Sequence, residues 1–186
     1  MNILKDSVRT FHCPRWNELP QISLYMDQVL IVLEESLSLF SLKSDVAATS
    51  TMINNYVKQK LLAPPEKKKY GKEHIAYLIM IFVLKRELAM SEITQLMSML
   101  NVKRTIPQIY DLFCDELELN LCSAFIDGFA QRNPIDQSDI SSTALKSALI
   151  AFSGKLLLQN LLAVDAETKK PVKSTKPSKS DNTAKS

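Results

Sequence analysis

The sequence predicts an all-α protein, and three observations lead to this prediction. Only three glycines occur among 186 residues, too few for the tight turns of an all-β fold or for a glycine-rich phosphate loop. Apolar residues recur at steps of three and four, which is the period of an amphipathic helix. Apolar residues make up 46% and charged residues 23% of the chain, as in globular proteins that bury a core without disulfides or metals.

The first predicted helix follows an irregular lead-in. We expect residues 1–17 to form this lead-in, docked onto the core by its phenylalanine and tryptophan. Pro20 suits the first turn of a helix, where a missing N–H costs nothing. The apolar series over 22–37 then predicts a helix from 20 to about 40, followed by a loop over 41–48.

A short helix and a basic loop come next. Thr49 or Ser50 can cap a helix over 51–59 by accepting a hydrogen bond from its first free N–H groups. Residues 60–70 are predicted to form a loop, because two prolines forbid a helix and three consecutive lysines forbid burial.

The remaining apolar series predict four helices, at 72–87, 91–100, 105–132 and 142–164. A Ser or Thr stands at the start of the last three, with Pro107 in the first turn of the longest. Residues 167–186 are rich in Lys, Ser, Thr and Pro and are predicted to be a disordered basic tail. We therefore divide the chain into an N-terminal unit, a C-terminal helical unit and the tail, over 1–100, 101–166 and 167–186.

The formal net charge of +3 hides a strong asymmetry. The segment 51–86 has a charge balance of +6 and the tail 167–186 one of +4, so the rest of the chain carries −7. A basic segment on an acidic body indicates a polyanionic partner.

The same composition argues against several classes of function. The three cysteines form no CxxC pair and are odd in number, which favours a reduced, cytoplasmic protein. Cys114 and Cys122 would stand about 12 Å apart along one helix, too far to share a metal ion, and we expect no metal and no cofactor.

The polar start of the chain argues against a signal peptide. The apolar stretch 148–164 is shorter than the ~20 residues of a membrane span, so we expect a buried helix and no membrane. Without a phosphate loop, a nucleophile elbow or a partnered histidine, no enzyme is expected.

The block 50–100 has the outline of a helix-turn-helix with a wing. A short capped helix presents polar residues outward, and a proline-stiffened basic loop follows it. Asn can pair with adenine in the major groove, and Lys can reach guanine or neutralise phosphates. The residues predicted to contact DNA are Thr51, Asn54, Asn55, Lys58, Lys60, Lys67, Lys68, Lys69, Tyr70 and Lys72. Each also has an ordinary structural interpretation: the lysine run as a solvated loop, the asparagines as outward helix residues and the tyrosine as a core anchor.

Part of this block resembles a known family. The run Met52–Leu62, with Pro64-Pro65 and Lys69-Tyr70 after it, resembles the winged-helix segment of MerR-type regulators. Two departures from that pattern are Asn54, where an arginine is usual, and Lys60, where a glycine relieves a left-handed turn; the wing also carries lysine in place of arginine.

A wider stretch more closely resembles a second family. The run from Pro14-Arg15-Trp16 through Leu100, including Leu24–Val29 and Pro65–Tyr70, resembles a bacterial uncharacterised family, the domain of unknown function numbered eighteen thirty-six. The two resemblances imply a MerR-like winged helix-turn-helix within an all-α protein.

The function implied is a transcriptional regulator that binds double-stranded DNA, with a possible homodimer through the helices 105–132 and 142–164. One alternative is a helical protein-interaction adapter that does not bind DNA specifically. Another is a sensor with a small-molecule pocket between the C-terminal helices, although the sequence indicates no particular effector.

Overall fold

The computed structural model describes residues 3–40, 48–128 and 139–168. Within these residues every regular element is a helix, and only two isolated β-bridges occur, so the predicted all-α class is confirmed. The α-helices are α1 (Ile3–Thr10), α2 (Met26–Ser36), α3 (Ser50–Lys58), α4 (Lys72–Leu84), α5 (Met90–Asn101), α6 (Ile106–Phe125) and α7 (Ile140–Thr168). Two short 3₁₀ helices are η1 (Trp16–Glu18) and η2 (Ser38–Phe40).

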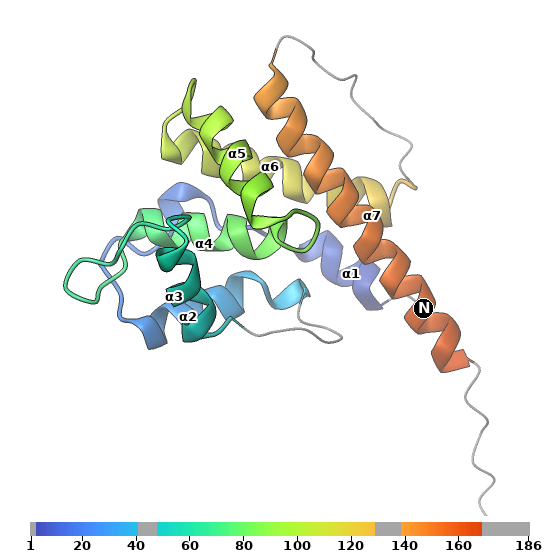
Figure 1. Cartoon of the computed structure of the whole chain (residues 1–186). Coiled ribbons are helices and arrows are strands. Elements are labelled where there is room, and N and C mark those ends of the chain that lie inside the picture. The colour runs from blue at the N-terminus through green and yellow to red at the C-terminus, as the bar shows by residue number, and fades with distance from the viewer. Residues whose placement is uncertain (1–2, 41–47, 129–138, 169–186) are drawn as a thin grey trace, which may run out of the picture.

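Helix α4 is the centre of the fold. From Ile75 to Leu84 every residue except Tyr77 is buried, and a helix that is apolar all round must be enclosed by other elements. It contacts α2, α6 and α7. In Figure 1, α2 and α3 lie on one side of it, and α5, α6 and α7 lie on the other. The candidate site is built on the α2 and α3 side.

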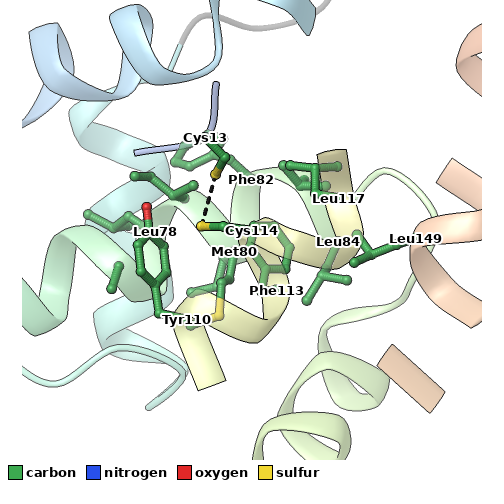
Figure 2. Close-up of a cluster of buried hydrophobic side chains, with 14 of the residues drawn as sticks. Cys13, Leu78, Met80, Phe82, Leu84, Tyr110, Phe113, Cys114, Leu117 and Leu149 are labelled. Atoms are coloured by element: carbon green, nitrogen blue, oxygen red, sulfur yellow. Dashed lines mark hydrogen bonds between the residues drawn. The ribbon is translucent and has the colours of Figure 1, made fainter. Parts of the chain in front are cut away.

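The apolar stripe of α6 packs within the chain. Its members, spaced four residues apart, are all buried: Ile109, Phe113, Leu117, Leu121 and Phe125. They meet α7 and α4, and part of this cluster is shown in Figure 2. The sequence left open whether this stripe packs inside one chain or across a dimer, and the structure places it inside. The helix ends at Phe125, earlier than expected, and the predicted remainder up to 132 falls mostly outside the described residues.

Two expectations for the N-terminal region were wrong. Residues 3–10 form α1, because Leu4 and Val8 lie one turn apart on one face, are both buried, and belong to a helix that contacts α6. The second helix begins at Met26, not at Pro20. The N–H of Leu24 donates to Tyr70, so this stretch is extended, and Ile22 is 72% exposed.

Smaller corrections concern helix starts. The helix predicted from Ser91 begins at Met90, because the Glu92 carboxylate accepts the N–H of Ala89 at 2.7 Å. The last helix begins at Ile140, just after Asp139, whose carboxylate accepts the N–H of Ser142. Arg104 pairs with the same carboxylate, so the approach to α6 and the start of α7 are joined.

Only part of the predicted buried helix over 148–164 is buried. Leu149, Phe152 and Leu156 lie in the core, whereas Leu158 and Leu162 are 55% and 61% exposed. Among the described residues one stretch, Ile140–Val164 of α7, is long and apolar enough to cross a membrane by length and composition. This is weak evidence, since core helices of soluble proteins meet the same criterion.

Candidate nucleic-acid interface

Helix α3 presents a polar face to solvent. The Thr49 hydroxyl accepts the N–H of Met52 at 3.3 Å, which confirms the predicted cap. Ile53 and Tyr56 fix the helix to the core, and the Tyr56 ring meets Phe82 edge to face with centroids 5.7 Å apart. The predicted base-reading residues are all exposed and share the outer face: Thr51, Asn54, Asn55 and Lys58. Their spacing of three and four residues places them on consecutive turns.

Helix α3 ends at a lysine in the left-handed conformation. Lys60 has φ of +59°, and the N–H groups of Leu61 and Leu62 both return to the carbonyl of Tyr56, at 3.0 and 3.2 Å. A glycine is the usual residue at such a position, because a Cβ there costs about 1–2 kcal/mol. The sequence analysis left Lys60 without the glycine that relieves a left-handed turn, and Lys60 itself adopts that turn.

Two further lysines occupy the tip of a tight turn between α3 and α4. The N–H of Lys69 donates to the carbonyl of Glu66 at 2.8 Å, and the central residues Lys67 and Lys68 have φ of +49° and +64°. Positive φ at both central positions is the signature of a type I′ turn, which prefers Asn-Gly. We call Glu66–Lys69 the lysine turn. Its three lysines are exposed, and Figure 1 shows the segment projecting from the body on the side away from α7.

The lysine turn is anchored by a backbone bridge. Leu24 and Tyr70 exchange two hydrogen bonds, N–H to carbonyl in each direction, at 2.9 and 2.8 Å. Tyr70 is only 3% exposed and its ring meets His74 edge to face, and burial raises its pKa. Tyr70 is therefore a core anchor, and its place among the predicted DNA-contacting residues was wrong.

Two aromatic residues outside the predicted set hold lysines of the site. The ammonium of Lys69 lies 5.0 Å from the ring centroid of Tyr25, and that of Lys72 lies 4.8 Å from that of Trp16. These cation–π contacts hold each of the two ammonium groups against an aromatic ring. Lys72 is half-buried in this arrangement, so it is less available to a ligand than the lysines of the turn.

An ion-pair network fixes Trp16 and its neighbours to α6. The Arg15 guanidinium donates to both oxygens of Glu118, at 2.7 and 2.8 Å. The N–H of Cys13 also donates to Glu118, and the N–H of Trp16 donates to Asp111. Burial would raise the pKa of Glu118, but the hydrogen bonds from Arg15 and Cys13 outweigh it, so the pKa is lowered. The Trp16 ring, which contacts Lys72, is thus held in place against α6.

Two of the three free cysteines are in contact, which the sequence did not predict. The Sγ atoms of Cys13 and Cys114 lie 3.1 Å apart in the core (Figure 2), and both side chains are buried. Nothing in the sequence indicates a contact between cysteines a hundred residues apart, whereas Cys114 and Cys122 are close along the chain. Within the described residues no three His, Cys, Asp or Glu side chains come together as a metal site would require.

These features define a helical protein with a basic face, built from the outer side of α3, the lysine turn and the start of α4. A protein-family model described as Domain of unknown function (DUF1836) matches residues 14–113, which is more than half of the chain and includes this whole face. The chain belongs to that family. A search of curated proteins found no match, and neither did a search of solved structures.

Proposed function

We propose that this protein is a cytoplasmic, DNA-binding transcriptional regulator of the MerR-like winged helix-turn-helix type. In this proposal α3 enters the major groove of double-stranded DNA, and the lysine turn acts as the wing against the phosphate backbone. The exposed polar face of α3 supports the first part, since a short helix with outward Asn and Lys residues suits base edges. The free cysteines support a reduced compartment.

The observation that carries the proposal is the conformation of Lys67 and Lys68. Both stand at left-handed positions, where Asn-Gly would cost less and lysine costs of the order of 1–2 kcal/mol per residue. Backbone strain of this kind is typical of functional sites, because folding stability alone would favour its removal. The strained residues supply exposed positive charge at the tip of a turn, and phosphate neutralisation needs such charge.

Different residues have different roles in this proposal. Asn54 and Asn55 read base edges, with Thr51 and Lys58 beside them on the same face. The lysines at positions 60, 67, 68 and 69 hold phosphates, which supplies affinity but no sequence information. Lys72, packed on Trp16, supports the edge of this surface.

The test begins with selection from a random duplex library at physiological salt in the presence of competitor DNA. Fluorescence anisotropy of the enriched duplex across salt concentrations then measures affinity and its salt dependence. We expect the triple variant K67A/K68A/K69A to weaken binding to all duplexes and to reduce the salt slope by about one per lost phosphate contact. Asn54→Ala should instead change which sequence is enriched.

A matched control separates the lysine turn from general charge. The variant K5A/K103A/K146A also removes three lysines, one each from α1, the turn before α6 and α7, all outside the proposed face, and should leave affinity nearly unchanged. If the triple variant behaved like this control, the assignment of the wing would be wrong. An unaltered preference in Asn54→Ala would contradict base reading by α3.

A second candidate function is a protein-interaction adapter without specific DNA binding. Three apolar residues beside the basic face favour it, since Ile22, Tyr25 and Ile31 are 72%, 52% and 55% exposed. Exposed apolar side chains that form one contiguous patch are typical of protein-binding surfaces, so the adapter requires these three side chains to act together. Weak, motif-free DNA binding that modest salt abolishes would favour the adapter, and Ile22→Ser would then be expected to weaken capture of the partner.

A further inference from the structure

Helices α5 and α7 lie next to each other (Figure 1) and border a groove with a volume of about 490 Å³. On α7 the residues that line it are short and recur at steps of three and four: Ala144, Ser147, Ala148 and Ala151. Residues with this spacing share one face of a helix, and their small side chains leave space between the two helices. The volume falls in the range of roughly 300–1,000 Å³ that is typical of small-molecule sites.

The opposite wall of the groove combines apolar and acidic residues. Leu96 and Met99 belong to α5, and Leu88 belongs to the turn before it. The polar residues on this wall are Gln95, Glu92 and Glu87. Among the described residues that line the groove none is positively charged, so the groove presents an apolar surface together with two carboxylates.

Glu87 is the more buried of the two carboxylates and lacks a hydrogen-bond donor. Its side chain is 16% exposed, and its Oε1 atom is enclosed without a hydrogen bond from the described residues. The ammonium of Lys155 lies 3.3 Å from this oxygen, but its hydrogen bond goes to the carbonyl of Arg86 at 2.8 Å. Glu92 differs, because it is exposed and accepts the N–H of Ala89. A buried carboxylate oxygen without a donor is costly, so Glu87 favours a ligand that brings an N–H group.

We propose that the groove binds a small amphiphilic cation, namely an apolar body that carries a protonated amine or a guanidinium group. The apolar body covers Leu88, Leu96 and Met99, and the cationic group donates a hydrogen bond to Glu87. Rotation about the terminal torsion of a glutamate is easy, so the carboxylate turns one oxygen toward this donor. Glu92 adds negative charge to the same groove and strengthens the attraction.

Size and charge together select this class of ligand. A protein partner typically covers about 20–30 residues on each side of an interface, whereas ten residues line the groove. Fatty acids and other anionic amphiphiles would bring a negative charge beside two carboxylates. A quaternary ammonium ion would supply the positive charge but not the N–H donor that Glu87 lacks. The site goes beyond the proposed DNA binding and does not depend on it.

The first test compares three probes that share one decyl chain: decylammonium, decyltrimethylammonium and decanoate. Isothermal titration calorimetry with the full chain, below the critical micelle concentration of each probe, measures affinity and stoichiometry. We expect one decylammonium ion to bind per chain, at least about tenfold more tightly than decyltrimethylammonium, because only the first donates a charge-assisted hydrogen bond. Decanoate should show no saturable binding.

The second test uses variants of the groove. Glu87→Gln keeps the shape of the side chain but removes its charge, and should weaken decylammonium binding at least about tenfold. Ala151→Leu, at an exposed position of α7, should fill part of the groove and weaken the binding of both cationic probes. The matched control Glu34→Gln removes a negative charge from the exposed side of α2 and should leave binding unchanged. Circular dichroism checks that each variant keeps its helical content.

Methyl NMR of a chain labelled at methionine locates the probe. The Met99 signal should shift on titration with decylammonium, whereas the signals of Met26 and Met52, on α2 and α3, should not. Three results would each overturn the proposal: equal affinity for decylammonium and decyltrimethylammonium, unchanged binding by Glu87→Gln, or an unshifted Met99 signal. Uptake of many probe molecules per chain without saturation would also overturn it, since it would show only unspecific surfactant binding.

Discussion

Leu24 and Tyr70 exchange two backbone hydrogen bonds, and this pair joins the segment before α2 to the end of the lysine turn. The Tyr70 ring is buried, so this residue supports the site by anchoring the end of the lysine turn in the core. We predict that Tyr70→Ala lowers the free energy of unfolding by about 3–5 kcal/mol, as large-to-small substitutions of buried rings do. Tyr70→Phe should leave DNA affinity unchanged within about twofold, which is well under 1.4 kcal/mol. Urea unfolding and anisotropy measure the two quantities.

The outcome for Tyr70→Phe also tests the corrected role of this residue. If the variant folded normally but lost DNA affinity by a factor of ten or more, the tyrosine hydroxyl would belong to the interface after all. Unchanged affinity would leave the surrounding lysines as the contact groups.

Substitutions in the lysine turn should change folding stability and DNA affinity in opposite directions. Replacing Lys67 by Asn and Lys68 by Gly supplies the residues that two left-handed positions favour. We predict that K67N/K68G raises the free energy of unfolding by about 1 kcal/mol. The same variant should weaken DNA binding and reduce the salt slope by about two, because two phosphate contacts are lost.

A control variant with the same change in net charge separates the effect of the turn from the effect of charge alone. K103Q/K146Q also removes two positive charges, but from outside the basic face, and should alter neither the turn nor DNA affinity. A K67N/K68G variant that is less stable than the wild type would contradict the assignment of strain to this turn. One that binds DNA normally would contradict its role as the wing.

The sequence predicted the helical class and most helices because their apolar periods are long and regular. The start of α2 was mispredicted since the backbone of Leu24 is used by Tyr70, a partner that no local pattern reveals. Helix α1 was missed because it buries only two residues of its short amphipathic pattern, Leu4 and Val8. In the first case a tertiary hydrogen-bonded pairing overrode the local helical pattern. In the second case the helical period was too short to be recognised.

The candidate site was predictable in its composition but not in its geometry. The outward face of α3 follows directly from helical spacing. The lysine turn does not, because Lys-Lys carries none of the Gly or Asn signals that mark a type I′ turn. The position of Trp16 under Lys72 depends on how the lead-in docks onto α6. The position of Tyr25 under Lys69 depends on the backbone bridge between Leu24 and Tyr70. No local sequence pattern indicates either contact.

The contact between Arg15 and Glu118 predicts a pH dependence of stability. The pKa of Glu118 is lowered in the folded protein: burial opposes the shift, but the hydrogen bonds from Arg15 and from the N–H of Cys13 outweigh it. A carboxylate with a lowered pKa stabilises the fold above its unfolded pKa of about 4.3, and this stability is lost as pH falls through the folded value. Glu118→Gln should therefore be less stable than the wild type at pH 7.

The difference in stability between the wild type and Glu118→Gln should shrink as the pH is lowered below about 4, because the wild-type carboxylate then becomes protonated. Thermal unfolding followed by circular dichroism between pH 7 and pH 3 measures it. Glu34→Gln, on the exposed side of α2, is the control for loss of a negative charge. A gap between wild type and Glu118→Gln that stays constant over this range would show that the side chain acts through packing and not through its charge.

The thiols of Cys13 and Cys114 are close enough to be joined by a mild oxidant. Diamide accepts two electrons and two protons from a pair of thiols, so the chain would gain one S–S bond and lose two hydrogens. We expect the reaction to be slow at neutral pH, because the hydrogen bond to Cys13 and burial raise the pKa of Cys114 and leave little thiolate. It should accelerate at higher pH or in dilute urea, which exposes the core.

The expected product is specific and its effect on stability is large. Peptide mapping should find Cys13 bound to Cys114, with Cys122 still free, and Cys13→Ser should abolish the product. Closing a loop of roughly 100 residues stabilises the fold by up to about 4–5 kcal/mol in the chain-entropy model, so the oxidised protein should unfold at higher urea. A disulfide to Cys122 or between chains would contradict the pairing seen in the core, whereas the expected product would confirm that the lead-in before η1 docks directly against α6.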